Sequence, residues 1–153
     1  MHEALVHEVT LQCSVAHAFK VFTQHVDLWW PPGHRKFANS TLHHDQSQGG
    51  RLIERGPNGE EFTFADILRI DPPHQMILAW HPGKITAPTQ TTVTFRPAGD
   101  GQTTVRVVHE EADAALGAAW PARAAMFDKG WTAILAALKE RIDTIETQLD
   151  EGK

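Results

Sequence analysis

The sequence has one cysteine, no tyrosine and no cluster of basic residues. Cys13 alone can form neither an internal disulfide nor a zinc site built from several cysteines. The formal net charge is −5, from 19 acidic and 14 basic residues, so the protein would on average repel a phosphate backbone. These absences argue against a disulfide-stabilised protein, a zinc ribbon and a nucleic-acid-binding protein.

Long apolar runs are also missing. No stretch approaches the roughly 18 to 20 residues that a membrane span requires. The first residues, MHEALVHEVTLQ, contain neither the basic nor the apolar segment of a secretory signal, so we expect a cytoplasmic protein without membrane insertion. The length of 153 residues and the 41% hydrophobic content suit one globular domain over residues 1–153.

Short segments of strand character are present, and turn signals separate them. Residues 3–11 alternate roughly as a strand would, and Ser14 then occupies a helix N-cap position before VAHAFKVFTQ. GPNGE and AGDGQ each lie between two strand-like runs and predict two hairpins, while HQMILAW supplies a further strand. The pattern predicts five or six antiparallel strands.

The run that follows GPNGE predicts one apolar face. Phe62, Phe64, Leu68 and Ile70 share one parity of this run, so an uninterrupted strand would place them on the same side. Asp66 falls on that parity too. We therefore expect its carboxylate to face the interior.

His109 is the second polar candidate for the interior, because it follows Val105 and Val107 on one side of its strand. With Asp66 it could supply a general acid or base, although buried polar groups more often serve only to satisfy their neighbours. If the two side chains pair, the pKa of His109 should lie above that of a free imidazole.

From about Trp120 onward the apolar period changes from two to between three and four, which predicts a long amphipathic helix. Pro121 suits its first turn. The apolar stripe comprises Phe127, Trp131, Ile134, Leu135, Leu138, Ile142, Ile145 and Leu149. Such a helix packs across an antiparallel sheet, and a curved sheet would leave a cavity near the N-terminal half of the helix.

The ten histidines do not form a metal-binding pattern. His43 and His44 are adjacent and would point in opposite directions in a strand, and the sequence contains no H-E-x-x-H or paired Cys-His spacing. The nucleophile motif G-x-S-x-G is also absent. We expect neither a metal nor another cofactor.

Several markers together resemble the SRPBCC (START/Bet v-like) superfamily. They are the turn GPNG, the DPP before MILAW, a strand that ends in VHEE, and the GW pair in the last helix. Within the superfamily the chain is most similar to the group named after the activator of the ninety-kilodalton heat-shock protein's ATPase. The resemblance implies an α+β helix-grip fold: about six to seven antiparallel strands curved around a long C-terminal helix, with two short helices after the first strand. It also implies a hydrophobic cavity.

Tryptophan is frequent in this chain, with five residues, and the stretch DLWWPPGH contains two of them. By resemblance this stretch lies at the cavity mouth, so we expect one indole in the core and the other at the entrance. Such aromatic rings can line a pocket for a flat apolar ligand. The predicted lining is Trp29, Trp30, Phe62, Phe64, Trp80, Val93, Phe95, Val107, His109, Phe127 and Trp131.

Three functions are compatible with these features. The first is a binding protein for a small hydrophobic or aromatic molecule, which needs only the apolar cavity. The second is a cyclase- or hydrolase-like enzyme that uses His109 or Asp66. The third, implied by the name of the group, is a chaperone-associated protein. The sequence leaves open the ligand and the choice between a monomer and a homodimer.

Overall fold

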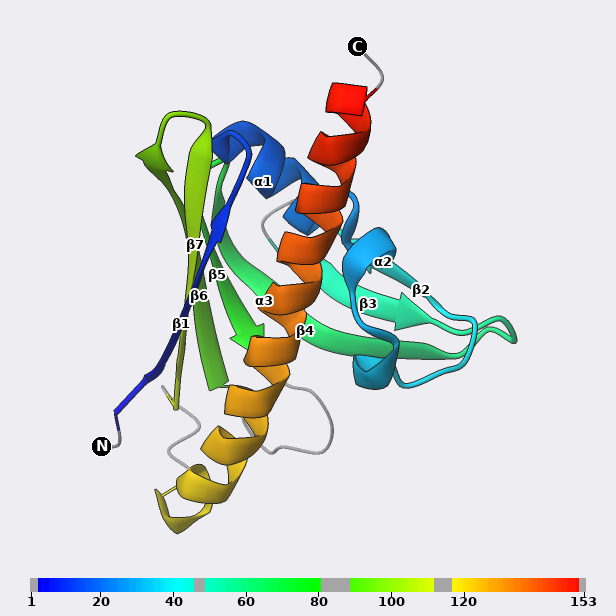
Figure 1. The fold of residues 1–153 in the computed structure, drawn as a ribbon. Coiled ribbons are helices and arrows are strands. Elements are labelled where there is room, and N and C mark those ends of the chain that lie inside the picture. The colour runs from blue at the N-terminus through cyan, green and yellow to red at the C-terminus, as the bar shows by residue number, and fades with distance from the viewer. Residues whose placement is uncertain (1–2, 46–48, 81–88, 112–116, 152–153) are drawn as a thin grey trace.

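A computed structural model describes residues 3–45, 49–80, 89–111 and 117–151 of the protein. One curved sheet of seven antiparallel strands holds a long helix against its concave face (Figure 1). The strand order is β1-β7-β6-β5-β4-β3-β2. The strands are β1 (Leu5–Leu11), β2 (Thr41–His44), β3 (Arg51–Arg55), β4 (Glu61–Asp71), β5 (Gln75–Trp80), β6 (Thr89–Gly99) and β7 (Gln102–Glu110).

Two short helices follow the first strand, and a long one ends the described chain. The helices are α1 (Val15–Thr23), α2 (Val26–Trp29) and α3 (Trp120–Glu151), with single 3₁₀ turns at η1 (Pro32–His34) and η3 (Gly117–Ala119). This arrangement confirms the predicted helix-grip fold. Among the described residues, no helix combines the length and the apolar character that crossing a membrane requires.

The helix boundaries lie where the capping residue and the proline in the sequence predict them. The Ser14 hydroxyl caps α1 by accepting a hydrogen bond from the His17 amide at 3.2 Å. α2 ends at Trp29, and Trp30 is extended, as expected for a residue before proline. The sequence did not predict β2, because this four-residue edge strand buries one apolar side chain, Leu42.

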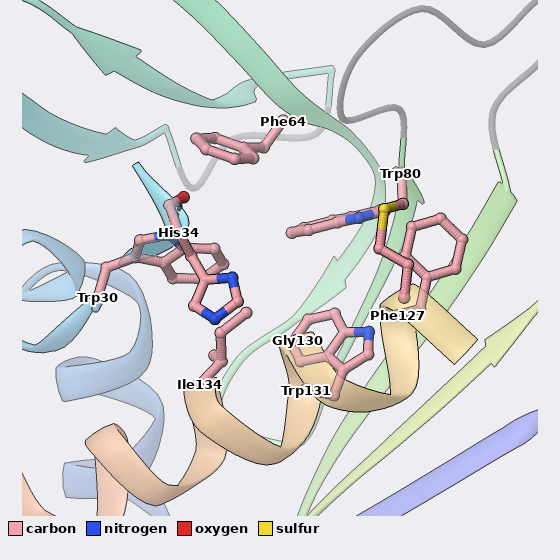
Figure 2. A pocket seen from close by; sticks show the side chains of 9 residues that line it. Trp30, His34, Phe64, Trp80, Phe127, Gly130, Trp131 and Ile134 are labelled. Atoms are coloured by element: carbon pink, nitrogen blue, oxygen red, sulfur yellow. Dashed lines mark hydrogen bonds between the residues drawn. The ribbon is translucent and has the colours of Figure 1, made fainter. Parts of the chain in front are cut away.

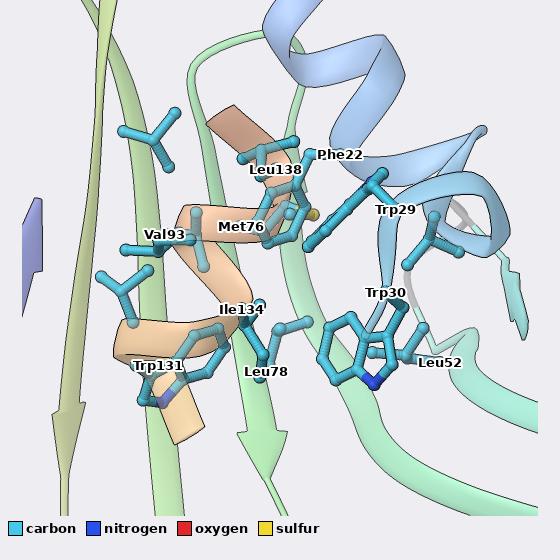
Figure 3. Close-up of a cluster of buried hydrophobic side chains, with 14 of the residues drawn as sticks. Phe22, Trp29, Trp30, Leu52, Met76, Leu78, Val93, Trp131, Ile134 and Leu138 are labelled. Atoms are coloured by element: carbon cyan, nitrogen blue, oxygen red, sulfur yellow. The ribbon is translucent and has the colours of Figure 1, made fainter. Parts of the chain in front are cut away.

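The core lies between the concave face of the sheet and α3 (Figure 3). Phe19 and Phe22 of α1 close one end by packing edge-on against Phe95, with ring centroids 5.3 and 5.6 Å away. Six members of the predicted stripe on α3 are buried: Phe127, Trp131, Ile134, Leu135, Leu138 and Ile142. The side chains of Ile145 and Leu149 lie outside the described residues.

Two bulges in β4 overturn the single parity predicted for its apolar face. The pairing of β4 shifts by one residue at Phe64 and again at Leu68, and each shift reverses the side on which the following residues point. Ile67 is therefore buried, with 1% exposed, whereas Leu68 is 49% exposed. Asp66 shares a face with its cross-strand partner Ala79, on the opposite side of β4 from Ile67. The predicted inward position of Asp66 is wrong.

Glu54 fixes the loop between η1 and β2 to the sheet. Its carboxylate is fully buried and accepts hydrogen bonds from the backbone amides of Lys36 and Phe37, both at 2.8 Å. A buried carboxylate with two backbone donors is well satisfied without a cation. This contact ties the loop that follows DLWWPPGH to β3 near the end of the strand.

We expect Glu54→Gln to lower the free energy of unfolding by about 1.5–3 kcal/mol, because the amide nitrogen of glutamine would face a backbone donor. Urea unfolding followed by tryptophan fluorescence measures the loss. Glu61→Gln is the matched control, since its exposed ion pairs with Arg51 and Arg55 contribute less than about 1 kcal/mol. Equal losses in the two variants would contradict the anchoring role of Glu54.

Candidate functional site

A pocket of about 160 Å³ lies between the N-terminal half of α3, the sheet and the DLWWPPGH loop, and it opens to solvent on one side (Figure 2). Most of its lining is aromatic or aliphatic. The lining residues are Trp30, His34, Phe64, Trp80, Met126, Phe127, Gly130, Trp131 and Ile134. His34 is the one titratable side chain among them.

The aromatic walls hold one another in place. The Trp80 ring lies 5.2 Å from Trp131 of α3, 6.1 Å from Phe64 and 6.2 Å from Trp30, measured between centroids. Phe64 and Trp30 are themselves 5.6 Å apart. Tilted aromatic pairs at these distances are favourable beyond the area that they bury. The aromatic side chains therefore fix the shape of the pocket by packing against one another.

The adjacent tryptophans of DLWWPPGH face different surroundings. Trp29 packs against Phe22 at 5.2 Å and donates its indole hydrogen bond to the Val21 carbonyl at 2.9 Å. Trp30 lines the pocket and donates to the His34 carbonyl at 3.2 Å. Both indole N–H groups thus have acceptors, as buried tryptophans require.

Arg35 stabilises the same segment through hydrogen bonds from its guanidinium to backbone carbonyl groups. Its guanidinium donates to the carbonyl oxygens of Trp30, Asp27 and Ser40 at 2.9, 2.7 and 3.1 Å. It also pairs with the Asp27 carboxylate at 2.8 Å, and that carboxylate accepts a hydrogen bond from the Leu42 amide. One half-buried ion pair therefore organises the rim of the pocket and its link to β2.

His109 lies directly behind the pocket wall and is fully buried. Its Nδ1 accepts a hydrogen bond from the Trp131 indole at 2.9 Å, and its Nε2 is 2.6 Å from the Thr89 hydroxyl. An indole can only donate, so the proton of the imidazole is on Nε2 and is donated to Thr89. The Thr89 hydroxyl in turn donates to the Trp80 carbonyl at 3.2 Å. This chain joins α3 to the end of β5.

Burial and, to a smaller extent, the nearby His7 lower the pKa of His109 to about 3. The imidazole is neutral near pH 7, and both of its nitrogens are occupied. Asp66 lies on the outer face of the sheet and forms no pair with it. The direction predicted for a His109–Asp66 pair is therefore wrong, and the two residues do not form an acid–base site.

The structure brings together five of the residues predicted to line the cavity and places the other six elsewhere. Trp30, Phe64, Trp80, Phe127 and Trp131 surround the pocket. The remaining six form the packing around it: Trp29, Val93, Phe95 and Val107 in the core, Phe62 half-buried against Phe64, and His109 behind Trp131. The sheet side of the core is thus filled, and the pocket with the aromatic lining lies beside the N-terminal half of α3.

Sequence reasoning missed four lining residues: His34, Met126, Gly130 and Ile134. Ile134 belongs to the predicted helical stripe, and His34 and Gly130 lie in stretches already singled out. No local pattern showed that these stretches meet, because η1 and α3 are about a hundred residues apart. Within the described ranges, no three His, Cys, Asp or Glu side chains gather closely enough to bind a metal ion.

Acid should destabilise the fold through His109. The pKa of His109 in the folded protein, about 3, lies below the ordinary value of 6.5. Its contribution to the free energy of unfolding is therefore fully present above pH 6.5 and is lost as the pH falls towards 3. At about 1.4 kcal/mol per pKa unit, acidification from pH 6.5 to 5 should remove about 2 kcal/mol. His44, whose burial lowers its pKa to about 4, adds a loss in the same direction.

Comparison of the wild type with His109→Phe isolates the contribution of His109. Urea unfolding at pH 7 and pH 5 should show a smaller loss for the variant, which keeps His44. The variant should also be about 1–3 kcal/mol less stable at pH 7, because the Trp131 indole loses its acceptor. The same pH dependence in both proteins would show that His109 does not carry this effect.

A family model described as "Activator of Hsp90 ATPase homolog 1-like protein" matches residues 12–143. Among proteins with curated functions, none matches the sequence. A solved structure of the self-sacrificing resistance protein CalC from Micromonospora echinospora is 32% identical, with a TM-score of 0.75 over 93% of this chain and 95% of that chain.

Two further solved structures are similar. The anthrahydroquino-gamma-pyrone synthase Txn09, complexed with SUM, is 29% identical, with a TM-score of 0.56 over 78% of this chain and 84% of that chain. The Aha1 dimer from Colwellia psychrerythraea is 15% identical, with a TM-score of 0.65 over 92% and 96%. The family model spans most of the chain and the fold agrees, so the protein belongs to the family of activator of Hsp90 ATPase homolog 1-like proteins, within the SRPBCC superfamily.

Proposed function

We propose that this protein binds a small hydrophobic or aromatic molecule in the pocket beside α3. The observation that supports this most directly is the open space of about 160 Å³ whose aromatic walls are already in place. An apolar cavity of about 150 Å³ can hold benzene. The pocket has room for about one aromatic ring, and the open side would let the rest of a larger ligand extend into solvent.

Two relatives support a small-molecule role. CalC is described as a resistance protein, and Txn09 as a synthase in complex with SUM. Fold alone does not choose among such functions. The similarity to these two proteins nevertheless agrees with an aromatic pocket better than with a purely structural role for the same residues.

An enzyme is the second candidate, and one observation favours it. His34 places an imidazole at the pocket, and its ring has no hydrogen bond to any residue that the structure describes. This side chain therefore replaces His109 and Asp66 as the candidate acid or base of a cyclase- or hydrolase-like reaction. A second converging polar side chain is lacking among the lining residues, so binding remains the stronger proposal.

A chaperone-associated role rests on the name of the family and on a fold likeness to the Aha1 dimer. Native mass spectrometry of the protein purified from its own source separates the three functions. A retained small molecule supports the binding role, a bound chaperone supports the third, and the same spectra give the monomer or homodimer mass. If the protein converts the retained molecule into a product during incubation, the result would support the enzymatic function.

Naphthalene, which has no hydrogen-bonding group, tests the pocket alone. We expect it to shift the indole N–H resonances of Trp30, Trp80 and Trp131 in ¹H–¹⁵N spectra. Ile134→Phe adds bulk to the lining and should weaken binding roughly tenfold. Ala136→Phe, at an exposed position of the same helix, should leave binding unchanged. The absence of any shift in the wild type, or equal effects of both variants, would overturn the proposed function.

A further inference from the structure

His34 presents its imidazole to the pocket from a firmly held backbone. Its carbonyl accepts the Trp30 indole N–H at 3.2 Å, and its amide donates to the Pro31 carbonyl at 3.1 Å. Figure 2 shows the ring between Trp30 and Ile134, directed towards the space in front of α3. Neither ring nitrogen bonds to any part of the chain that the structure describes. The ring is therefore positioned through its backbone and keeps its hydrogen-bonding capacity.

The other lining side chains offer no strong hydrogen-bond acceptor. The indole N–H groups of Trp30 and Trp131 are already used by His34 and His109. An indole only donates hydrogen bonds, phenyl and aliphatic groups do neither, and a thioether is a weak acceptor. Among the nine lining residues, His34 is the only side chain that can strongly accept as well as donate a hydrogen bond.

Gly130 of α3 faces the same corner of the pocket. Glycine is less favourable than alanine inside a helix, and the local structure does not require it here. A Cβ atom built at this position would meet only the Cε1 atom of His34, at 3.9 Å, which is an ordinary contact. Packing within the protein would thus tolerate alanine, and what glycine provides is open space beside the imidazole.

We propose that His34 and Gly130 form a specificity corner for an aromatic ligand that carries a hydroxyl group. The ligand ring stacks among the tryptophans, its edge lies over Gly130, and its hydroxyl hydrogen-bonds to the His34 imidazole. This inference rests on the proposed function and adds the chemical class of the ligand. It assigns His34 a binding role and requires no bond-making step.

Comparison of 2-naphthol with naphthalene tests the role of His34, with both affinities measured by calorimetry and by shifts of the Gly130 amide. One added hydrogen bond should make the wild type bind 2-naphthol about 3- to 10-fold more tightly. His34→Leu should remove this preference while still binding naphthalene. The backbone contacts of residue 34 do not depend on its side chain, so the pocket should persist in the variant.

Gly130→Ala tests the open space, with Ala133→Gly as the matched control on the exposed side of the helix. Gly130→Ala should raise the melting temperature by about 2–4 °C, and it should weaken binding of 2-naphthol several-fold. Ala133→Gly should lower the melting temperature and leave binding unchanged. A gain in stability with loss of binding is a result that a purely structural glycine would not produce.

The outcomes separate this inference from the proposed function. Equal binding of 2-naphthol and naphthalene, unchanged in His34→Leu, would overturn the specificity corner and leave the apolar pocket supported. Unchanged binding in Gly130→Ala would overturn the role of Gly130 in the same way. If neither compound binds the wild type, both the proposed function and the specificity corner are wrong.

Discussion

Helix α3 is joined to the sheet at the pocket by a chain of hydrogen bonds from Trp131 through His109 and Thr89 to the Trp80 carbonyl. These hydrogen bonds form only while His109 is neutral, because its Nδ1 must accept a hydrogen bond from the Trp131 indole N–H. Burial ensures this by lowering the pKa of His109 to about 3. A histidine that resembles a catalytic group in the sequence thus positions two aromatic walls, and the geometry of the pocket depends on it.

The opposite wall is organised by a different kind of contact. The DLWWPPGH segment consists of the end of α2 and the 3₁₀ turn η1, joined at Trp30 and Pro31. Arg35 bonds to the carbonyl oxygens of Asp27 and Trp30 within it, and Glu54 fixes the loop that follows. Charged side chains with several hydrogen bonds each can hold a proline-rich loop where backbone pairing cannot. The loop can therefore present Trp30 and His34 to the pocket as firmly as α3 presents Trp131.

A pocket between two such walls combines apolar enclosure with one available imidazole. Its volume of about 160 Å³ is small beside typical sites for drug-sized ligands, because the core residues of the sheet fill the space further along α3. The proposed ligand is therefore held by one ring and one polar group. Gly130 is consistent with this view, since the helix has a less favourable residue where a side chain would reduce the pocket.

Local patterns in the sequence determined most of the elements and the burial of the stripe on α3, because apolar period, capping residues and turn residues act over a few positions. The family markers added the helix-grip arrangement. Tertiary structure decided what lies where the elements meet. Bulges in β4 turned Asp66 outward, pairing with Trp131 made His109 a structural group, and the packing of η1 against α3 brought His34 to Gly130. Such contacts join residues far apart in the chain, and no local period encodes them.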